Sequence, residues 1–167
     1  MSISLLPDIM VDSLTSITPE LLKMHGIRLL MMDFDNTIVP YTTDVPQKEF
    51  LDWLAGMKES DVHLCVVSNS KNSRVPKFCK EHGLDCITHA RKPFSDGIFR
   101  CVAKYGIEPN ACALVGDQIF TDTLGANCAG IKSILVPAID NHNIWLKMRH
   151  VAEMPFIFMA KKRRIRL

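Results

Sequence analysis

A chain of 167 residues with 47% hydrophobic and 23% charged residues has the length and composition of one globular domain with a sizeable core. It contains no run of 18 apolar residues and does not start with a basic segment followed by an apolar one, so we expect neither a membrane-spanning helix nor a secretory signal. The net charge is +2, but five of the 20 Lys and Arg residues lie in the last seven positions. The other 15 stand against 18 acidic residues, so a mildly acidic body precedes a strongly basic tail.

The cysteines argue for a reducing compartment. They are scattered and include no Cys-x-x-Cys pair, which argues against a zinc site or a disulfide framework. We therefore expect reduced thiols in the core and a cytoplasmic protein. The six residues are Cys65, Cys79, Cys86, Cys101, Cys112 and Cys128.

The first predicted elements are a short helix and a buried strand. Thr18 is a typical N-cap, Pro19 suits the first helical position, and Gly26 can end the helix. The apolar run 27–32 then predicts a buried strand of a parallel sheet. The weakly patterned residues 1–16 give no prediction.

Two carboxylates follow this strand. Asp33 and Asp35 project to the same side of an extended chain, at the strand end where α/β sheets bind ligands. The two carboxylates repel each other unless a cation or a shared proton relieves them, and Mg²⁺, which takes oxygen ligands and also holds substrate phosphate, suits the position. The alternative is a strand end that turns into an ordinary loop. The apolar run before the pair and Asn36-Thr37 after it favour the functional interpretation.

The next helix and strand lead to hydroxyl and amide groups. The pattern predicts a helix over 46–60 and a second buried strand over 62–67, so the gap between the two strands holds one crossover helix and no inserted lid domain. Ser68, Asn69 and Ser70 end the second strand and can donate hydrogen bonds to phosphate oxygens. Alternatively, Ser70 only caps the following helix.

The pattern then predicts a further helix, with Val75 and Phe78 on its apolar face, and a short strand over 85–88. The basic pair Arg91-Lys92 follows this strand. Lys92, which precedes a proline, offers a fixed cation that would offset the charge of several carboxylates and a phosphate. Arg91 is the neighbour that a shift of one position would substitute. The alternative is a solvated basic pair before a proline-started helix.

A further aspartate, Asp117, follows another predicted strand. A helix from Phe94, which places Phe94 on its apolar face, ends at Gly106 and is followed by a buried strand over 111–115. Gly116 then lets the backbone turn tightly, so that Asp117 points into the same crevice as Asp33 and Asp35.

The alternation of strands and helices, with a last strand over 133–136, predicts the α/β class and parallel βαβ units. We expect a three-layer, Rossmann-like core around a central parallel sheet, without a large cap domain. A single domain over 1–160 would precede a basic carboxyl-terminal tail over 161–167.

The polar segments together resemble the four motifs of the haloacid-dehalogenase (HAD) superfamily of aspartate-nucleophile phosphatases. The run Asp33-Phe34-Asp35-Asn36-Thr37 is similar to the first motif of subfamily III. Ser68 matches the second motif, Lys92 the third, and Gly116-Asp117 with Asp122 the fourth. The resemblance covers roughly residues 5–137. Three shorter segments resemble the YqeG-type branch more narrowly: Leu6-Pro7-Asp8, Ile17-Thr18-Pro19-Glu20 and Val39-Pro40-Tyr41.

The resemblance implies a Mg²⁺-dependent phosphomonoester hydrolase that works through an aspartyl-phosphate. Asp33 would be the nucleophile and Asp35 the general acid and base. The metal would be held by Asp33, Asp117, the backbone carbonyl of Asp35, and Asp122 as ligand or neighbour of a ligand. The phosphate would be bound by Asn36, Thr37, Ser68, Asn69 and Lys92.

The substrate stays more open than the chemistry. Without a cap the site favours a phosphate on something large, either a lipid head group or a phosphorylated macromolecule. Phosphatidylglycerophosphate phosphatases of mitochondria and plastids are relatives of the YqeG-type branch, which favours a lipid. Phosphotransfer to another hydroxyl acceptor uses the same intermediate. A non-catalytic binding or scaffold protein of this fold is disfavoured, because Asp33, Asp35, Lys92 and Asp117 are all present.

The carboxyl-terminal segment suggests a membrane contact. Apolar and aromatic residues over 144–159 precede the basic residues of 161–167, and such a combination is attracted to an anionic bilayer surface. The alternative is a last helix on the sheet with a solvated tail. Nucleic-acid binding is disfavoured, because no aromatic stacking platform accompanies the basic residues.

Overall fold

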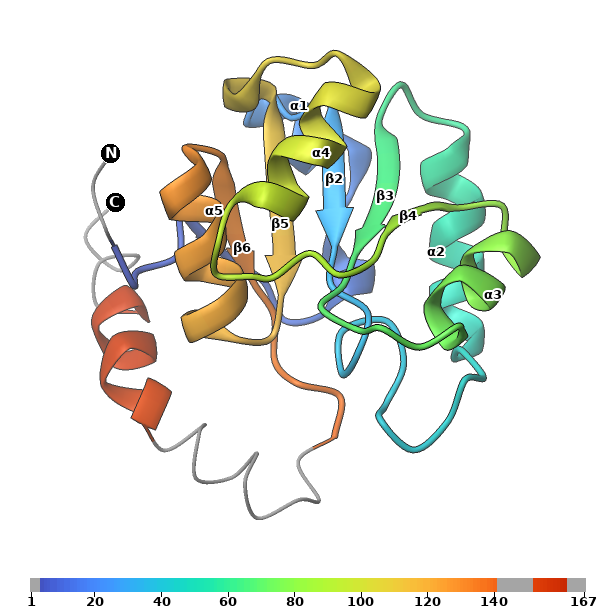
Figure 1. Ribbon diagram of the computed structural model, residues 1–167. Helices are drawn as coiled ribbons and strands as arrows, with labels where there is room; N and C mark the ends of the chain where they lie inside the picture. Colours follow the sequence, from blue (N-terminus) through green and yellow to red (C-terminus); the bar gives the residue numbers. More distant parts are fainter. Residues whose placement is uncertain (1–3, 141–151, 162–167) are drawn as a thin grey trace.

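A six-stranded, all-parallel sheet lies at the centre of the molecule (Figure 1). The computed structural model describes residues 4–140 and 152–161. The strands follow the order β1-β6-β5-β2-β3-β4 across the sheet. They are β1 (Ile9–Met10), β2 (Leu29–Met32), β3 (His63–Val67), β4 (Asp85–Ile87), β5 (Cys112–Gly116) and β6 (Lys132–Leu135). The helices are α1 (Pro19–Met24), α2 (Lys48–Lys58), α3 (Arg74–Glu81), α4 (Asp96–Tyr105), α5 (Leu124–Ala129) and a further helix over 152–161.

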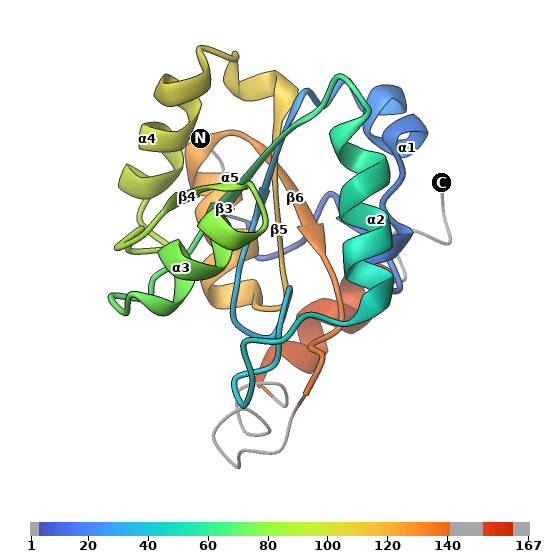
Figure 2. The same cartoon turned by 90° about the vertical axis from the view of Figure 1, so that its right-hand side faces the viewer.

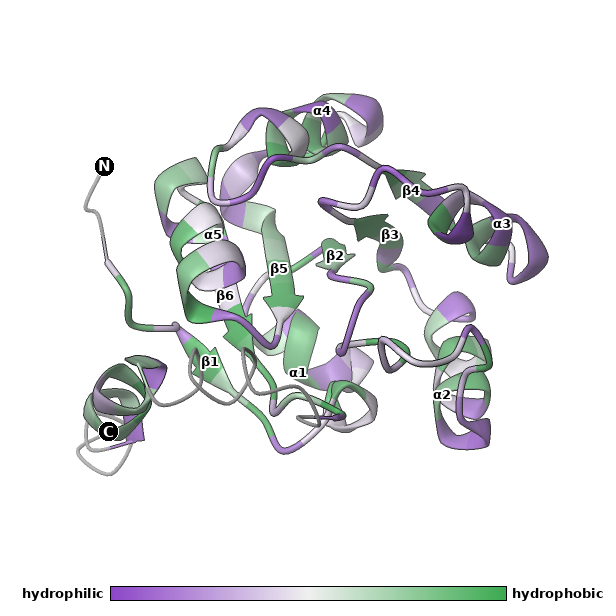
Figure 3. Ribbon diagram, turned by 60° about the horizontal axis from the view of Figure 1, so that its bottom comes forward, coloured by the Kyte–Doolittle hydropathy of each residue, from purple (hydrophilic) through white to green (hydrophobic). Residues whose placement is uncertain are grey.

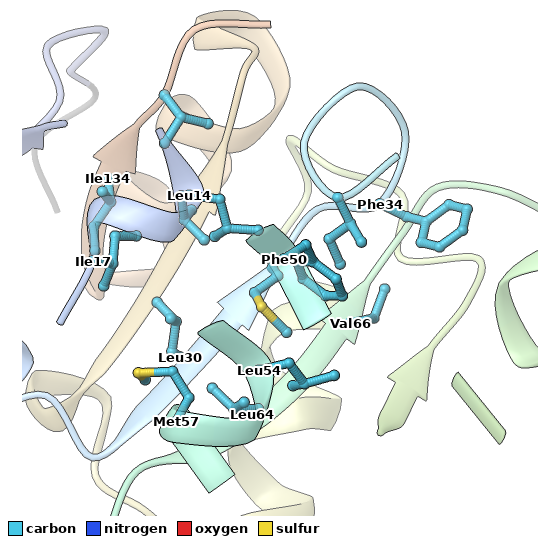
Figure 4. Close-up of a cluster of buried hydrophobic side chains, with 14 of the residues drawn as sticks. Leu14, Ile17, Leu30, Phe34, Phe50, Leu54, Met57, Leu64, Val66 and Ile134 are labelled. Carbon is cyan, nitrogen blue, oxygen red and sulfur yellow. The ribbon is translucent and has the colours of Figure 1, made fainter. Parts of the chain in front are cut away.

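Helices cover both faces of the sheet and make the three layers. Alternate residues of β2 point to opposite faces, so Leu30 and Met32 join one apolar cluster, whereas Leu29 and Met31 join the other. Helices α1 and α2 cover the first face, and α4 and α5 cover the second (Figure 2). Figure 4 shows the first cluster, where Phe50 of α2 packs toward the sheet. All residues of β2 are fully buried, which explains its continuous apolar sequence.

Strand β2 is the topological switch point of the sheet. It pairs with β3 on one side and with β5 on the other. The chain runs outward from β2 to β3 and β4, and then crosses back to continue with β5 and β6. In open α/β sheets the crevice at such a point, beyond the carboxyl ends of the strands, is where ligands bind. Only one helix, α2, separates β2 from β3 along the chain, so no cap domain is inserted there.

The predicted strands and helices up to residue 136 are confirmed, with boundaries shifted by a few residues. Thr18 is the N-cap of α1 and its hydroxyl accepts a hydrogen bond from the Leu21 N–H. The prediction for Phe94 was wrong: this residue precedes α4 and is 71% exposed. The cis peptide bond between Lys92 and Pro93 lies just before it.

One strand was not predicted, and one helix was predicted only as the alternative to a membrane contact. Strand β1 lies in the unassigned residues 1–16 and pairs with β6 at the sheet edge, where Ile9 is opposite Ile134. The helix over 152–161 lies beside this edge, shown in red in Figure 1. Of the basic tail over 161–167, only Lys161 lies within the described residues.

The distribution of apolar residues agrees with this layered core. In Figure 3 the strands are mainly green, while purple gathers on the outward surfaces of helices such as α2 and α3. The six cysteines are free thiols, four of them buried. In the parts of the chain that the structure describes, no helix is long and apolar enough to cross a bilayer.

Candidate active site

Three buried aspartates meet at the switch point. Asp33 directly follows β2 and Asp117 directly follows β5, while Asp122 lies on the helical turn Ile119–Thr123. The Asp33 N–H donates to the Val115 carbonyl at 2.9 Å, which continues the pairing of the two strands into the site. One carboxylate oxygen of each aspartate lies within 4.8 Å of the others. The structure therefore brings together three of the four predicted metal-binding residues.

Lys92 lies against this cluster as a buried cation. Its Nζ is 2.6 Å from Asp33 Oδ1 and 2.7 Å from Asp122 Oδ1, and its side chain is 1% exposed. Asn69 fixes its backbone, because the Asn69 side chain accepts from the Lys92 N–H at 2.7 Å and donates to the Lys92 carbonyl at 2.9 Å. Arg91 is exposed. The structure thus selects Lys92 from the basic pair.

The charges of the cluster perturb one another. Burial raises the pKa of Asp33 to about 7, although Lys92 opposes this rise and Asp122 adds to it. Burial disfavours the charged form of Lys92, but Asp122 and Asp33 outweigh burial and raise the pKa of its ammonium group. Lys92 therefore stays protonated. Three carboxylates around one lysine leave an excess of negative charge when all are ionised.

Gly116 allows Asp122 to approach the end of β5. A Cβ atom added to Gly116 would lie 2.3 Å from Asp122 Oδ2, closer than any side chain tolerates. In this position Asp122 Oδ2 also accepts a hydrogen bond from the Gln118 N–H at 3.2 Å. The glycine of the Gly-Asp pair thus serves the position of the second acid as well as the backbone turn.

The predicted phosphate-binding residues fall into two groups. Ser68 directly follows β3 and Thr37 lies in the loop after β2; both are buried, and among the described residues Thr37 Oγ1 has no hydrogen-bond partner. Asn36 adopts a left-handed backbone, and its side chain donates to the Asp140 carbonyl at 2.6 Å and accepts from the Asp140 N–H at 2.9 Å. Asn36 and Asn69 therefore position backbone segments with their side chains, while Thr37 offers an unused hydroxyl for a ligand.

Asp35 stands apart from the aspartate cluster. Its side chain pairs with Arg74, whose Nη1 is 2.6 Å from Asp35 Oδ1. Burial raises the pKa of the Asp35 carboxyl group, and the nearby Arg74 lowers it in part. A raised pKa favours a group that must carry a proton for part of a reaction cycle.

The donor set suits a hard divalent cation. Asp33, Asp117 and Asp122 supply only carboxylate oxygens, as Mg²⁺ prefers, and a divalent cation would neutralise their excess charge. The Asp35 side chain lies outside the cluster, so its predicted share in metal binding is that of its backbone carbonyl.

Two residues near the site were missed by the sequence analysis. Arg74 is the first residue of α3, and an arginine at a helix amino terminus, where the helix dipole disfavours cations, was the available signal. Glu153 is 2% exposed, and its Oε1 accepts from the Ile119 N–H at 3.0 Å and from the Phe120 N–H at 3.4 Å. The signal for Glu153 was its isolation as the one acidic residue after Asp140.

Comparisons with known proteins identify the family of the chain. Residues 89–138 match the family model described as HAD-hydrolase-like. The chain is 35% identical over 131 residues to the probable phosphatase YqeG of Bacillus subtilis, which covers 78% of this chain and 76% of the relative.

Solved structures of the superfamily share the fold. One is the cobalt-bound form of the deoxy-D-mannose-octulosonate 8-phosphate phosphatase YrbI of Haemophilus influenzae. It has a TM-score of 0.55 and 12% identity, over 76% of this chain and 77% of that chain. Another is a haloacid dehalogenase-like hydrolase of Streptococcus pneumoniae. It has a TM-score of 0.55 and 13% identity, over 70% of this chain and 88% of that chain.

Proposed function

The chain is a phosphatase of the HAD superfamily and belongs to the family of Bacillus subtilis YqeG, and we propose that it is a Mg²⁺-dependent phosphomonoester hydrolase with an aspartyl-phosphate intermediate. One observation supports this proposal above all: the buried Asp33 carboxylate lies at the switch point between a fixed lysine and two further carboxylates.

Asp33 attacks phosphorus, and the bond to the leaving alkoxide breaks as the new acyl-phosphate bond forms. Asp35 gives its proton to the alkoxide and then removes a proton from the water that hydrolyses the intermediate. Lys92 offsets negative charge on the transferring phosphoryl group, and the Thr37 and Ser68 hydroxyls donate hydrogen bonds to its oxygens. Catalysis is then mainly positioning and charge neutralisation.

Asp33, Asp117 and Asp122, with the backbone carbonyl of Asp35, would hold Mg²⁺. When bound, the ion supplies positive charge that screens the phosphoryl oxygens from the attacking carboxylate.

Phosphate release from p-nitrophenyl phosphate tests the mechanism. We expect release with Mg²⁺, none after chelation, and a loss of at least about 1,000-fold in Asp33→Asn, because the nucleophile is removed. Mass spectrometry of the quenched wild type should show a phosphate adduct that Asp33→Asn lacks. A fully active Asp33→Asn protein would contradict the assignment.

We further propose that the phosphate is carried by an anionic lipid such as phosphatidylglycerophosphate. A cavity of about 390 Å³, a size typical of ligand pockets, reaches Asp117 and runs between the ends of β1 and β6 and the helix over 152–161. Its lining is mainly apolar and includes the charged residues Asp12, Asp117 and Lys161. Apolar residues of the lining include Met10, Leu135, Pro137, Met154, Ile157 and Phe158. Such a cavity suits the apolar part of a lipid whose phosphate lies at the aspartates.

The exposed residues of the same helix favour work at a membrane surface. Met154, Phe158 and Met159 are 54%, 70% and 54% exposed, and basic residues follow them in the sequence. We propose peripheral contact of a cytoplasmic protein with an anionic bilayer.

A variant of the cavity separates the lipid from a small ester. We expect Phe158→Ser to raise KM for phosphatidylglycerophosphate in mixed micelles by about 10-fold, since burial of this exposed phenyl ring by the bound lipid would contribute about 1.5–3 kcal/mol. The KM for p-nitrophenyl phosphate should stay within about twofold. Release from the small ester alone by the wild type would instead point to a phosphoprotein or another macromolecular substrate.

A further inference from the structure

Arg74 connects the predicted general acid to the loop beside it. Its Nη1 binds Asp35 Oδ1 at 2.6 Å, and its Nη2 donates to the carbonyls of Pro40 and Thr43 at 2.9 and 2.6 Å. Its Nε pairs with Asp44. One guanidinium group thus connects the start of α3 to Asp35 and to the loop over 40–44.

The surroundings indicate that this arrangement is built for the site. The guanidinium carbon lies over the ring of Phe34, 5.1 Å from its centre, and Phe34 is the residue between Asp33 and Asp35 in the sequence. Arg74 is the first residue of α3, where the positive end of the helix dipole disfavours a cation, so the helix itself gains nothing from its charge. The side chains of Arg74 and Asp35 are each 21% exposed, so the pair is accessible to solvent, unlike the buried aspartate cluster.

We propose that Arg74 is a positioning residue that holds the Asp35 carboxylate in the orientation required for proton transfer to the leaving group. This inference rests on the proposed phosphatase mechanism. Arg74 occupies Oδ1, which confines the transferable proton to Oδ2. As the Asp33 oxygen bonds to phosphorus and the bond to the leaving oxygen breaks, this proton moves from Asp35 to that oxygen. In the second step a proton of the attacking water returns to Asp35 as the bond between Asp33 and phosphorus breaks.

The dependence of rate on the leaving group tests this role. A good leaving group departs without a proton, whereas a basic one needs the general acid, which contributes about 100-fold or more. For Arg74→Met and a series of phenyl phosphates of increasing leaving-group basicity, we expect kcat for the most basic member to fall about 100-fold. For p-nitrophenyl phosphate it should fall less than about fivefold, and KM for each ester should change less than about twofold. Arg74→Lys keeps a cation but loses the planar, multidentate guanidinium group. Its kcat for the most basic ester should lie between those of the wild type and Arg74→Met.

The control is Lys104→Met, which breaks the exposed ion pair of Lys104 and Asp85, 2.7 Å apart and remote in sequence from both loops. It should leave the leaving-group dependence unchanged. Circular dichroism and thermal unfolding establish that each variant is folded, and Arg74→Lys carries the test if Arg74→Met does not fold.

If Arg74→Met lost the same factor in kcat for every ester, changed only in KM, or did not change, the role of Arg74 would be overturned. The phosphatase activity itself would not be in question. A wild type that hydrolyses only p-nitrophenyl phosphate lacks acid assistance and also overturns it. A wild type that releases no phosphate would overturn the proposed mechanism itself.

Discussion

At the scale of single residues, the site is a balance between one buried cation and three buried carboxylates. Lys92 contacts Asp33 and Asp122 directly, and Asp117 completes the cluster. A buried charge that loses its partner is much less stable than a paired one. Each member of the cluster therefore affects both catalysis and folding. A substitution that lowers the activity can lower or raise the free energy of unfolding, depending on the residue.

Lys92→Met should reduce both activity and stability. Its removal leaves Asp33 and Asp122 buried without their cation, which costs about 3–5 kcal/mol of unfolding free energy, and kcat should fall at least about 100-fold. Urea unfolding and phosphate release measure the two effects. Arg91→Met is the matched control, because Arg91 is exposed, and its unfolding free energy should change by less than about 0.5 kcal/mol. The reverse ranking would assign the site cation to Arg91.

Asp33 should make the metal-free protein less stable as the pH rises. Burial raises the pKa of Asp33 from 3.8 to about 7, so between these values the folded protein holds a proton that the unfolded chain has released. The free energy of unfolding therefore falls as the pH rises from about 4 to about 7, by a few kcal/mol at most. Asp33→Asn cannot ionise, so its unfolding free energy in the presence of a chelator should be flatter over this range, and higher than that of the wild type at pH 8.

The exposed carboxylate of Asp85 serves as the control, because its contribution to the free energy of unfolding grows as the pH rises instead of falling. Hydrogen bonds from Lys104 and Tyr105 lower the pKa of Asp85, so its contribution to stability is present above 3.8 and disappears as the pH falls through its lowered pKa. Asp85→Asn should change the curve only at the acid end. A wild type and an Asp33→Asn variant with parallel curves from pH 5 to 8 would contradict the raised pKa of Asp33.

At the scale of elements, close approach of backbone to side chain decides where the aspartates lie. Gly116 ends β5, and Asp122 occupies the space that any side chain at position 116 would need. The position of Asp122 thus depends on a residue that carries no functional group.

Gly116→Ala should displace Asp122 and weaken metal binding. The added Cβ would lie 2.3 Å from Asp122 Oδ2, so we expect the Mg²⁺ concentration for half-maximal activity to rise by about 10-fold or more. Gly56→Ala is the matched control: it lies within α2, nothing lies within 4 Å of its added Cβ, and the helix should gain about 0.5–1 kcal/mol. An unchanged Mg²⁺ dependence in Gly116→Ala would show that Asp122 does not serve the metal.

Local sequence patterns predicted the main strands and helices and the aspartate–lysine cluster. The apolar runs of β2, β3 and β5 are fully or nearly fully buried, and polar residues at their carboxyl ends meet because parallel strands end at one edge. What the sequence could not give are pairings between distant side chains and backbone. Asn36 binds the backbone of Asp140, and Arg74 binds Asp35, and neither pair has a sequence spacing that predicts its contact.

At the scale of the whole molecule, the helix over 152–161 is fastened to the catalytic body. Glu153 binds the N–H groups at the start of the helical run from Ile119, and Phe156 packs against Phe120 with ring centres 6.1 Å apart. The same run carries Asp122. The carboxyl-terminal helix thus supports the loop of the fourth motif and forms one wall of the cavity beside Asp117.

Glu153→Ala should loosen this attachment. It leaves two amide groups at a helix start without their acceptor, so the free energy of unfolding should fall by about 1–3 kcal/mol. Amide hydrogen exchange over 119–123 should accelerate in parallel. Met154→Ala, on the same helix and 54% exposed, should change the unfolding free energy by less than about 0.5 kcal/mol. Unchanged exchange in Glu153→Ala would contradict the fastening role.

The pairing of β1 with β6 has a consequence for biosynthesis. The Asp8 N–H donates to the Ser133 carbonyl across a separation of 125 residues, so β1 finds its partner only when β6 has left the ribosome. Until then the amino-terminal strand of the nascent chain has no neighbour, and the sheet edge at β5 is open. Strands β2 to β6 can pair during translation, but β1 can join the sheet only after the residues of β6 have been synthesised.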